Sequence, residues 1–326
     1  MSHFGKLMCN GLRMFTILAV ATEPLLGQSM PHYHIVKRIE FDSGSADFLA
    51  IDTAGRRLYG IGTKVIDIDH DSLVGELPTF TGLGFALAPE LTRGLGRRGV
   101  LFDLKSLAFI RRINVRGDGS AYDPVSHRAF MLDDTTTVVD MVTGDIVGRI
   151  RLGDLTESGI GDGLGRIYVN VTNALDSADT REEALVVVLN SERLSIDARW
   201  HLQGCYRPAG MAINRTDSLL FVACVQKILV IDMRDGRVLA AVAIPGHPDQ
   251  LAFDSRAKIL FAPAGRGTMT LIREESPTRF INAGVVYTAE GEKSVAVDER
   301  THKVFLYHFV RGGAGSHLRV IILSPV

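Results

Sequence analysis

The chain has 326 residues, of which 46% are hydrophobic and 22% charged, so it holds enough apolar material for an ordinary globular core. Its 36 lysines and arginines almost balance its 37 aspartates and glutamates, and its pI is about 6.8. A surface that binds nucleic acid is normally strongly basic, so nucleic acid is not expected as a partner. The sequence has no uninterrupted run of about 18 apolar residues, which excludes a conventional membrane span.

Residues 1–29 have the order of a secretory signal peptide. Lys6 and Arg13 precede an apolar run at 14–21, and a stretch that contains Gly27 and Ser29 follows. We therefore expect this leader to be removed and residues 30–326 to form a single exported domain, either periplasmic or secreted. The alternative is a disordered leader that stays attached to the domain.

From residue 33 onward the chain repeats a unit of about 40 residues. The clearest unit, at 208–244, has the pattern of four short strands in succession, and its second strand carries an aromatic residue. The positions that close the first strand of each unit are Asp52, Pro89, Asp123, Asp162, Asn214, Asp254 and Asp298. Third strands are expected to end at Asp69, Asp103, Asp140 and Asp232. Seven four-stranded units of this length predict an all-β fold, a seven-bladed β-propeller.

The two ends of the repeat region complement each other. The seventh unit ends with a third strand at 318–323, and the strand at 34–41 has the pattern of a fourth strand without the first three. We expect these two strands to pair, so that the N-terminal strand closes the last blade and no long sheet edge is left. Longer loops at 173–183 and 311–316 are expected to project from the same face of the ring.

Several units resemble a known family. The pattern D-x-x-x-R-x-[LI]-Y, the sequence IYVN at 167–170 and the stretch LAPELTRG at 87–94 are similar to the YVTN-repeat, or YncE-like, β-propellers of bacteria, which include exported proteins. The resemblance covers residues 34–326 and implies the propeller fold. It implies no particular activity. Lactonases, quinoprotein dehydrogenase subunits and haem d1 enzymes have similar blades, but none of their site residues can be matched to positions of this chain.

One face of a propeller gathers the loops around its central channel, and pockets form at such mouths. The polar side chains expected to surround this mouth are Asp47, Asp118, Glu157, Arg207, Asp249, Gln250, Lys293 and His308. This mixture of charges suits a metal or a polar ligand, and we expect a binding module for a small polar ligand or a protein partner. We expect a monomer with no cofactor, and a divalent cation is the alternative. The alternative is a water-filled channel that binds nothing.

The four carboxylates of this set leave an enzyme interpretation open. Carboxylate oxygens hold hard divalent cations, so their convergence would support a metal-assisted lactonase or another hydrolase. Their pairing with Arg207 or Lys293 would instead favour a salt-bridged channel. The sequence contains no HxxEH, GxSxG or Walker motif that would assign a catalytic centre. A third interpretation is a scaffold subunit of an envelope complex.

Two cysteines remain when Cys9, in the leader, is set aside. Cys205 precedes the first strand of the fifth unit, and Cys224 ends the second strand of the same unit. Because these strands are expected to be antiparallel neighbours, both sulfur atoms should lie at the same face. In an exported protein this arrangement predicts a disulfide, and free buried thiols or a redox or metal role are the alternatives.

Overall fold

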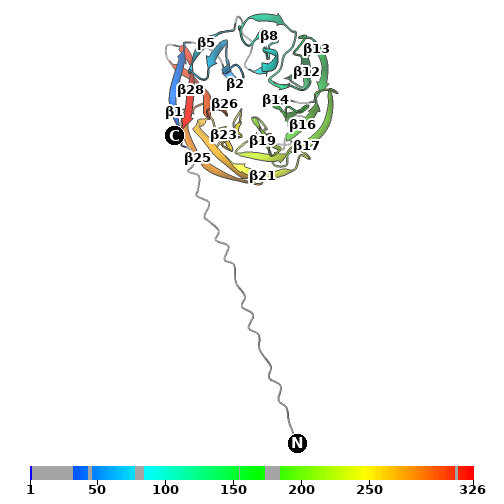
Figure 1. Cartoon of the computed structure of the whole chain (residues 1–326), viewed down its shortest axis with the longest axis vertical. Coiled ribbons are helices and arrows are strands. Elements are labelled where there is room, and N and C mark those ends of the chain that lie inside the picture. The colour runs from blue at the N-terminus through cyan, green and yellow to red at the C-terminus, as the bar shows by residue number, and fades with distance from the viewer. Residues whose placement is uncertain (2–31, 43–45, 78–83, 154, 173–183, 313–314) are drawn as a thin grey trace, which may run out of the picture. The chain divides into compact units, whose positions relative to one another are not determined.

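The computed structural model describes Met1 and residues 32–42, 46–77, 84–153, 155–172, 184–312 and 315–326. The expected signal peptide, the loop at 173–183 and part of the loop at 311–316 lie outside these residues. The described chain forms seven sheets of four antiparallel strands, arranged as blades around a ring (Figure 1). The predicted seven-bladed β-propeller is confirmed. The described part of the chain contains no helix that is long and apolar enough to cross a membrane.

Each of the first four blades uses four consecutive strands, ordered from the channel outward. Blade 1 consists of β2 (Ala46–Asp52), β3 (Arg57–Ile61), β4 (Lys64–Asp67) and β5 (Ser72–Glu76). Blade 2 consists of β6 (Phe85–Ala88), β7 (Arg93–Gly96), β8 (Val100–Asp103) and β9 (Phe109–Arg112), with the short helix η1 (Pro89–Leu91) after β6. Blade 3 consists of β10 (Gly119–Asp123), β11 (Arg128–Leu132), β12 (Thr135–Asp140) and β13 (Ile146–Arg151). Blade 4 consists of β14 (Leu155–Gly161), β15 (Arg166–Thr172), β16 (Ala184–Asn190) and β17 (Ser195–His201).

Blades 5 and 6 follow the same order, and blade 7 takes its outermost strand from the start of the chain. Blade 5 consists of β18 (Met211–Asn214), β19 (Leu219–Cys224), β20 (Lys227–Asp232) and β21 (Val238–Ala243). Blade 6 consists of β22 (Ala252–Asp254), β23 (Ile259–Pro263), β24 (Arg266–Ser276) and β25 (Arg279–Glu290). Blade 7 consists of β26 (Val295–Asp298), β27 (Lys303–Gly312), β28 (Gly315–Pro325) and β1 (Tyr33–Phe41).

The ring closes as predicted, through antiparallel pairing of β1 with β28. The register runs from Tyr33 opposite Pro325 to Phe41 opposite Leu318, with one irregularity after Ile35. The first and last described strands of the domain therefore lie side by side, which leaves blade 7 with the same four strands as the others. Strand β1 thus pairs with the edge of β28 that would otherwise be exposed.

In every blade except blade 2, which has Pro89, the polar residue that closes the first strand caps the turn that follows. Asp52 Oδ1 accepts hydrogen bonds from the backbone N–H groups of Ala54 and Gly55, at 3.0 and 2.8 Å. Asp254 repeats this arrangement with the amides two and three residues later. Such side chains satisfy backbone donors in a tight turn, which explains why the repeat carries an aspartate there. Five of the seven predicted positions end the first strand, and the other two follow it directly.

One predicted strand end is wrong. The third strand of blade 1 ends at Asp67 rather than Asp69. Asp67 Oδ1 accepts the N–H groups of Asp69 and His70, at 2.8 and 2.9 Å, so Asp67 caps the turn. Asp69 instead forms an ion pair with Arg56 at 2.8 Å. The other predicted third-strand ends are confirmed: Asp103, Asp140 and Asp232.

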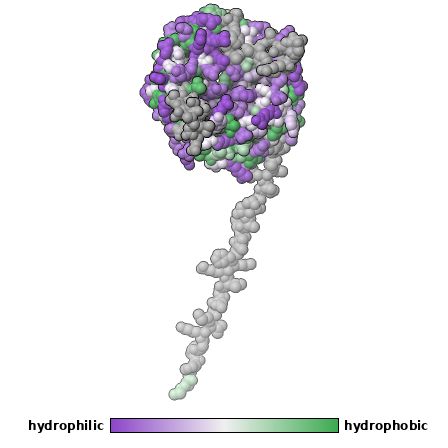
Figure 2. Space-filling view, turned by 180° about the vertical axis from the view of Figure 1, so that it is seen from behind, coloured by the Kyte–Doolittle hydropathy of each residue, from purple (hydrophilic) through white to green (hydrophobic). Residues whose placement is uncertain are grey.

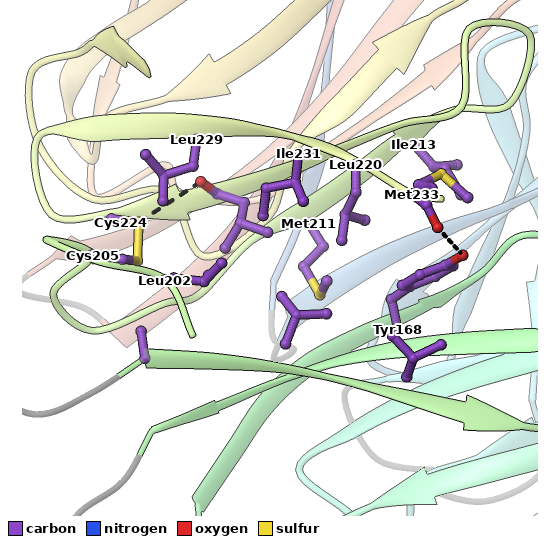
Figure 3. Close-up of a cluster of buried hydrophobic side chains, with 14 residues drawn as sticks. Tyr168, Leu202, Cys205, Met211, Ile213, Leu220, Cys224, Leu229, Ile231 and Met233 are labelled. Atoms are coloured by element: carbon purple, nitrogen blue, oxygen red, sulfur yellow. Dashed lines mark hydrogen bonds between the residues drawn. A yellow bond between two sulfur atoms is a disulfide. The ribbon is translucent and has the colours of Figure 1, made fainter. Parts of the chain in front are cut away.

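Apolar side chains gather at the junctions between blades, where the described residues form seven buried clusters, one for each neighbouring pair. Figure 3 shows the cluster between blades 4 and 5, with the Tyr168 hydroxyl pointing toward the carbonyl oxygen of Met233. The surface in Figure 2 is mostly hydrophilic, with apolar residues scattered over it. Burial at the junctions is therefore what holds the blades together.

A basic residue at the start of the second strand ties some blades to the next one. In blades 1 and 3 this residue directly follows the arginine position of the D-x-x-x-R pattern, which holds Arg56 and His127. Arg128, the first residue of β11, donates to the carbonyl oxygens of Ser191 and Glu192 in blade 4, at 2.6 and 2.7 Å. Arg57, the equivalent residue of blade 1, reaches the Lys105 carbonyl of blade 2 at 2.9 Å. In these blades the start of the second strand thus contacts the neighbouring blade in addition to following the turn.

Candidate functional site

The first strands of neighbouring blades contact one another around the whole ring, so they line the central channel. The channel contains a narrow cavity of about 170 Å³. Its wall combines apolar residues such as Phe48 and Met211 with the hydroxyls of Ser120 and Ser158. Ser158 already donates a hydrogen bond to the Ala209 carbonyl at 2.6 Å, so this part of the wall has a structural role.

A second cavity, of about 220 Å³, lies on the loop-rich face, and we call it the mouth pocket. Four of the predicted site residues line it, and each comes from a different blade or blade connection: Glu157, Arg207, Asp249 and Lys293. Asp249 also lines the channel cavity, so the two spaces adjoin. Half of the residues predicted from the sequence therefore meet at one concave site.

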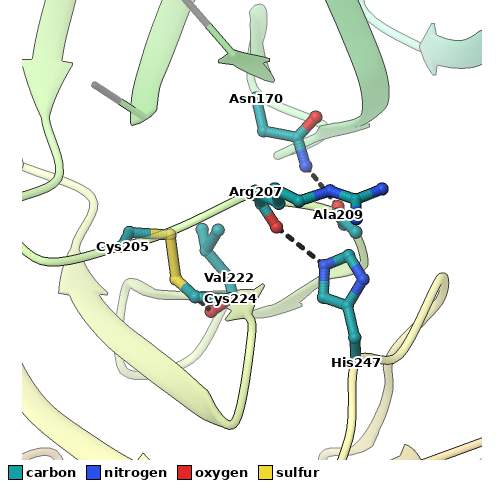
Figure 4. Close-up of a disulfide and its surroundings, with 7 residues drawn as sticks. All are labelled: Asn170, Cys205, Arg207, Ala209, Val222, Cys224 and His247. Carbon is teal, nitrogen blue, oxygen red and sulfur yellow. Dashed lines mark hydrogen bonds between the residues drawn. A yellow bond between two sulfur atoms is a disulfide. The ribbon is translucent and has the colours of Figure 1, made fainter. Parts of the chain in front are cut away.

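The disulfide holds the loop that carries Arg207. Cys205 and Cys224 are bonded, with their Cα atoms 5.3 Å apart, which confirms the predicted pairing. In Figure 4 the disulfide lies at one end of the segment that continues through Arg207 to Ala209. The Ala209 N–H donates to the Ala223 carbonyl at 2.9 Å, and Asn170 of blade 4 donates to the Ala209 carbonyl. The segment is thus fixed at both ends.

His247 lines the mouth pocket, although it was not among the predicted site residues. Its Nε2 lies 2.7 Å from the carbonyl oxygen of Arg207 (Figure 4). A carbonyl can only accept, so Nε2 carries the proton of this bond. Burial lowers the pKa of His247, which favours the neutral ring at pH 7. The remaining nitrogen, Nδ1, is then an acceptor.

The charges of the mouth pocket are only partly paired. Asp249 forms an ion pair with Lys293 at 3.4 Å. Among the described residues, neither Glu157 nor Arg207 is in an ion pair. Burial and the neighbouring carboxylates raise the pKa of Glu157, whereas the positive charge of Arg207 lowers it. The pocket therefore presents one carboxylate and one guanidinium to whatever enters it.

Two other predicted residues, Asp47 and Asp118, do not line the mouth pocket and share one cation. Arg97 Nη1 is 3.3 Å from Asp47 Oδ2 and 3.1 Å from Asp118 Oδ1. Burial raises the pKa of Asp47 to about 6, although Arg97 acts against this shift. The sequence identified Arg97 only as a loop residue, because nothing in the local pattern shows that it bridges two blades.

Gln250 has a structural role instead of an open binding position. Its Oε1 accepts from the Leu49 N–H at 2.9 Å, and its Nε2 donates to the Leu49 carbonyl at 2.7 Å. Gln250 precedes blade 6 and Leu49 belongs to blade 1, and blade 7 lies between these two blades in the ring. The side chain therefore crosses one side of the channel and joins two blades that are not neighbours.

His308 lies away from the mouth pocket and the channel cavity. Burial, together with Arg319 and His317, lowers its pKa, so its surroundings are those of the outer strands of blade 7. Burial and the charges of Asp47 and Asp249 raise the pKa of its neighbour Tyr307 to about 12. Successive residues of a strand point to opposite faces, so Tyr307 and His308 face different sides of the sheet.

The arrangement that the hydrolase interpretation requires is not formed in the described part of the chain. There, no three histidine, cysteine, aspartate or glutamate side chains come close enough to hold a metal ion. Three of the four predicted carboxylates, Asp47, Asp118 and Asp249, are instead paired with Arg97 or Lys293, and only Glu157 is not. This is the pattern expected for a channel mouth stabilised by ion pairs.

The mouth face also contains a buried carboxyl group whose titration we expect to affect stability. Glu292, beside Lys293, is fully buried, and one oxygen accepts from the Ala289 N–H at 2.8 Å. Burial raises its pKa to about 7, although Arg319 and Arg38 oppose this shift. Between pH 4.5 and 7 the folded protein thus binds a proton that the unfolded chain has lost, so stability falls as the pH rises through this window.

Replacing Glu292 by glutamine is expected to remove this dependence. The variant keeps an acceptor for the Ala289 N–H but cannot ionise, so at pH 8 it should be more stable than the parent by roughly 3 kcal/mol. At pH 4 the two should differ little. Urea unfolding at both pH values measures the difference, and Glu290→Gln, at an exposed neighbouring position, is the matched control. A difference that does not change with pH would contradict the assignment.

Comparisons with known proteins identify the fold. No family model and no curated protein matches the sequence. The structure is similar to a chain of hydrazine synthase from Kuenenia stuttgartiensis, with a TM-score of 0.69 and 13% identity over 82% of this chain and 94% of that chain. It is also similar to the RRP9 WD40 repeats, with a TM-score of 0.68 and 9% identity over 89% and 97%. A chain of the mitotic checkpoint complex matches over 97% and 99%, with a TM-score of 0.68 and 10% identity. At these identities the likeness shows a WD40-like propeller fold alone.

Proposed function

We propose that this protein is a binding module whose mouth pocket takes a small polar molecule that carries both a positive and a negative group. The observation that carries the proposal is the meeting of Glu157, Arg207, Asp249 and Lys293 at one cavity of about 220 Å³. A zwitterion can pair its cation with Glu157 and its anion with Arg207. Charge-assisted hydrogen bonds of this kind are stronger than those between neutral groups.

A screen of small zwitterions tests this function. Amino acids and betaines are added to the purified chain, and thermal melting identifies those that raise the melting temperature. Each ligand found is then titrated by calorimetry against Glu157→Gln and Arg207→Gln. Each variant is expected to bind at least about tenfold more weakly, because the loss of one charge-assisted bond costs about 1.5–3 kcal/mol.

Asp235→Asn and Arg237→Gln are matched controls, since they remove the same charges from an exposed pair in the β20–β21 turn, remote from the mouth pocket. Binding should be unchanged in both variants. If no zwitterion shifts the melting temperature, or if the controls weaken binding as much as the pocket variants, the proposed function is wrong.

A protein partner is the second candidate, and apolar residues at the rim favour it. Leu155 lines the mouth pocket with 65% of its surface exposed, and Tyr206, next to Arg207, is 47% exposed. Two similar structures are described as WD40 repeats and as part of a checkpoint complex, and propellers commonly act as such modules. A protein partner would bury the rim, so Leu155→Ser should weaken the binding of that partner. Binding of a small zwitterion depends on the charged residues alone, so the same substitution should leave it unchanged.

Export to the periplasm or the exterior is part of the proposal. It is supported by the order of residues 1–29 and by a buried disulfide, because disulfides are rare in proteins that stay in a reducing cytosol. Membership of the YVTN-repeat propellers is proposed on the sequence pattern alone. A scaffold subunit of an envelope complex would have the same location, and it would bind a protein partner as the second candidate function requires.

A further inference from the structure

A larger cavity, of about 780 Å³, lies on blade 2. It is formed by the turn between β7 and β8 and by the segment that connects β9 to β10. Four arginines line it, and we call it the arginine groove: Arg97, Arg98, Arg112 and Arg116. Asp118 is the one carboxylate among its described lining residues. The chain as a whole has a formal charge of −1, so this is a local concentration of positive charge.

The two segments that form the groove are locked together through their backbones. The Ile113 N–H donates to the Gly99 carbonyl at 2.7 Å. Gly99 has a φ of 76°, and a Cβ atom at this position would stand 1.9 Å from the Ile113 oxygen. Only glycine permits this approach. The backbone positions that carry the arginines are therefore fixed relative to each other before any ligand arrives.

The arginine side chains are arranged by contacts that leave the groove positive. Arg97 donates to the Asp118 carbonyl at 2.7 Å and pairs with the Asp118 carboxylate, so the only acid of the described lining is already engaged. Arg112 Nη1 donates to the Arg98 carbonyl at 3.3 Å, which places its guanidinium over the β7–β8 turn. Arg112 and Arg116 are exposed to solvent. Their charge is available to an anion from outside.

We propose that the arginine groove binds a small polyvalent oxyanion, such as a phosphorylated or polycarboxylated metabolite. Guanidinium groups match the planar oxygen pairs of phosphate and carboxylate and bind them in a bidentate manner. The volume of the groove falls in the range of small-molecule sites. A monovalent ion would leave most of the positive charge unpaired, so a ligand with several negative charges fits better.

Calorimetric titration of the full chain with pyrophosphate and with citrate, at constant ionic strength set by sodium chloride, tests the proposal. At least one of the two should bind saturably. Which one binds more tightly distinguishes a phosphate from a carboxylate ligand. The double substitution Arg112→Gln and Arg116→Gln should weaken binding at least about tenfold, because both positions are exposed and the fold does not depend on them. An unchanged melting temperature verifies that the variant is folded.

Arg111→Gln is the matched control. This arginine is the neighbour of Arg112 on β9, is exposed, and pairs with Asp145 outside the groove, so its loss should leave binding unchanged. The mouth-pocket variants Glu157→Gln and Arg207→Gln should also bind the anion normally, so this site and the proposed function can fail independently. The proposal is overturned if neither anion binds saturably at constant ionic strength. It is also overturned if Arg111→Gln weakens binding as much as the double variant.

Discussion

Arg56→Met is expected to lower the free energy of unfolding by about 3–5 kcal/mol at pH 7, because the substitution leaves a buried carboxylate without its cation. Arg56, from the first turn of blade 1, makes two parallel hydrogen bonds to Asp298 of blade 7, at 2.7 and 2.5 Å. The Asp298 side chain is only 1% exposed. Urea unfolding at pH 7 measures the loss. Methionine preserves most of the packing of the arginine stem, so the effect reports on the charge.

The pH dependence of the free energy of unfolding should identify Asp298 as the group that causes the loss of stability in Arg56→Met. Burial alone would raise its pKa, but the bonds from Arg56 and Thr301 outweigh burial and hold the pKa at about 2. In the parent protein this stabilisation is present above pH 3.8 and is lost as the pH falls toward 2. In Arg56→Met the pKa of Asp298 is raised by burial, so at low pH the carboxyl group is protonated. Protonation removes the unpaired buried charge and with it the destabilisation of the variant. The difference from the parent should therefore shrink between pH 7 and pH 4.

Arg300→Met provides the control at the same junction. Arg300 pairs with Asp69 at 2.5 Å but is 57% exposed, and exposed ion pairs contribute only about 0–1 kcal/mol. The loss of Arg300 should therefore cost much less than the loss of Arg56. Equal losses in the two variants would show that burial of Asp298 is not the cause.

Removal of the disulfide is expected to cost about 3 kcal/mol in the chain-entropy model, since the bond closes a loop of 19 residues. Replacement of both Cys205 and Cys224 by alanine, followed by urea unfolding, measures this loss. The loop that carries Arg207 would lose its covalent anchor, so ligand binding at the mouth pocket should weaken as well. Val222→Ala, in the same blade core, serves as a control that lowers stability without releasing this loop.

Reduction of the parent protein gives an independent measurement. A reducing agent should lower the melting temperature of the parent to about that of the double alanine variant and should leave the variant unchanged. If the parent melts at the same temperature with and without the reducing agent, although thiol titration shows that the bond is broken, the disulfide does not contribute to stability.

The fold was predictable from the sequence because each repeat carries its own local signals. Asp52 and Asp254 cap turns through hydrogen bonds to residues two and three positions later, so their role depends on neighbours in the chain. The aromatic residue of the second strand, such as Tyr59 or Phe130, is fully buried at a blade junction in every case that follows the pattern. Repetition of short-range signals at a fixed period is enough to specify a propeller.

The candidate site was only partly predictable, since its contacts cross between blades. Gln250 was expected to face a ligand, but it hydrogen-bonds Leu49, 201 residues away in the sequence. His308 was expected at the mouth, but it does not line the mouth pocket, and the face to which a strand residue points changes with a shift of one position. Asp69 was expected to end the third strand of blade 1, in a segment that offers three alternating aspartates, and only the structure shows that the strand ends at Asp67, which caps the turn.

The pairing of β1 with β28 has a consequence for biosynthesis. The two strands are about 290 residues apart in the chain, so β1 leaves the ribosome long before its partner exists. At a typical synthesis rate the interval is roughly 15–60 s, during which the other blades can form. Contacts between such distant segments also form slowly, because a large loss of chain entropy precedes them.

During this interval the nascent molecule is an open arc with two unsatisfied ends. Strand β1 carries the charged residues Lys37, Arg38 and Glu40 at exposed positions, and charges along an unpaired strand discourage its addition to the sheets of other chains. The apolar cluster between blades 7 and 1, which includes Phe41 and Phe305, is then the last to leave water. The pairing of β1 with β28 therefore covers an unpaired strand edge and an apolar cluster at the same place in the ring.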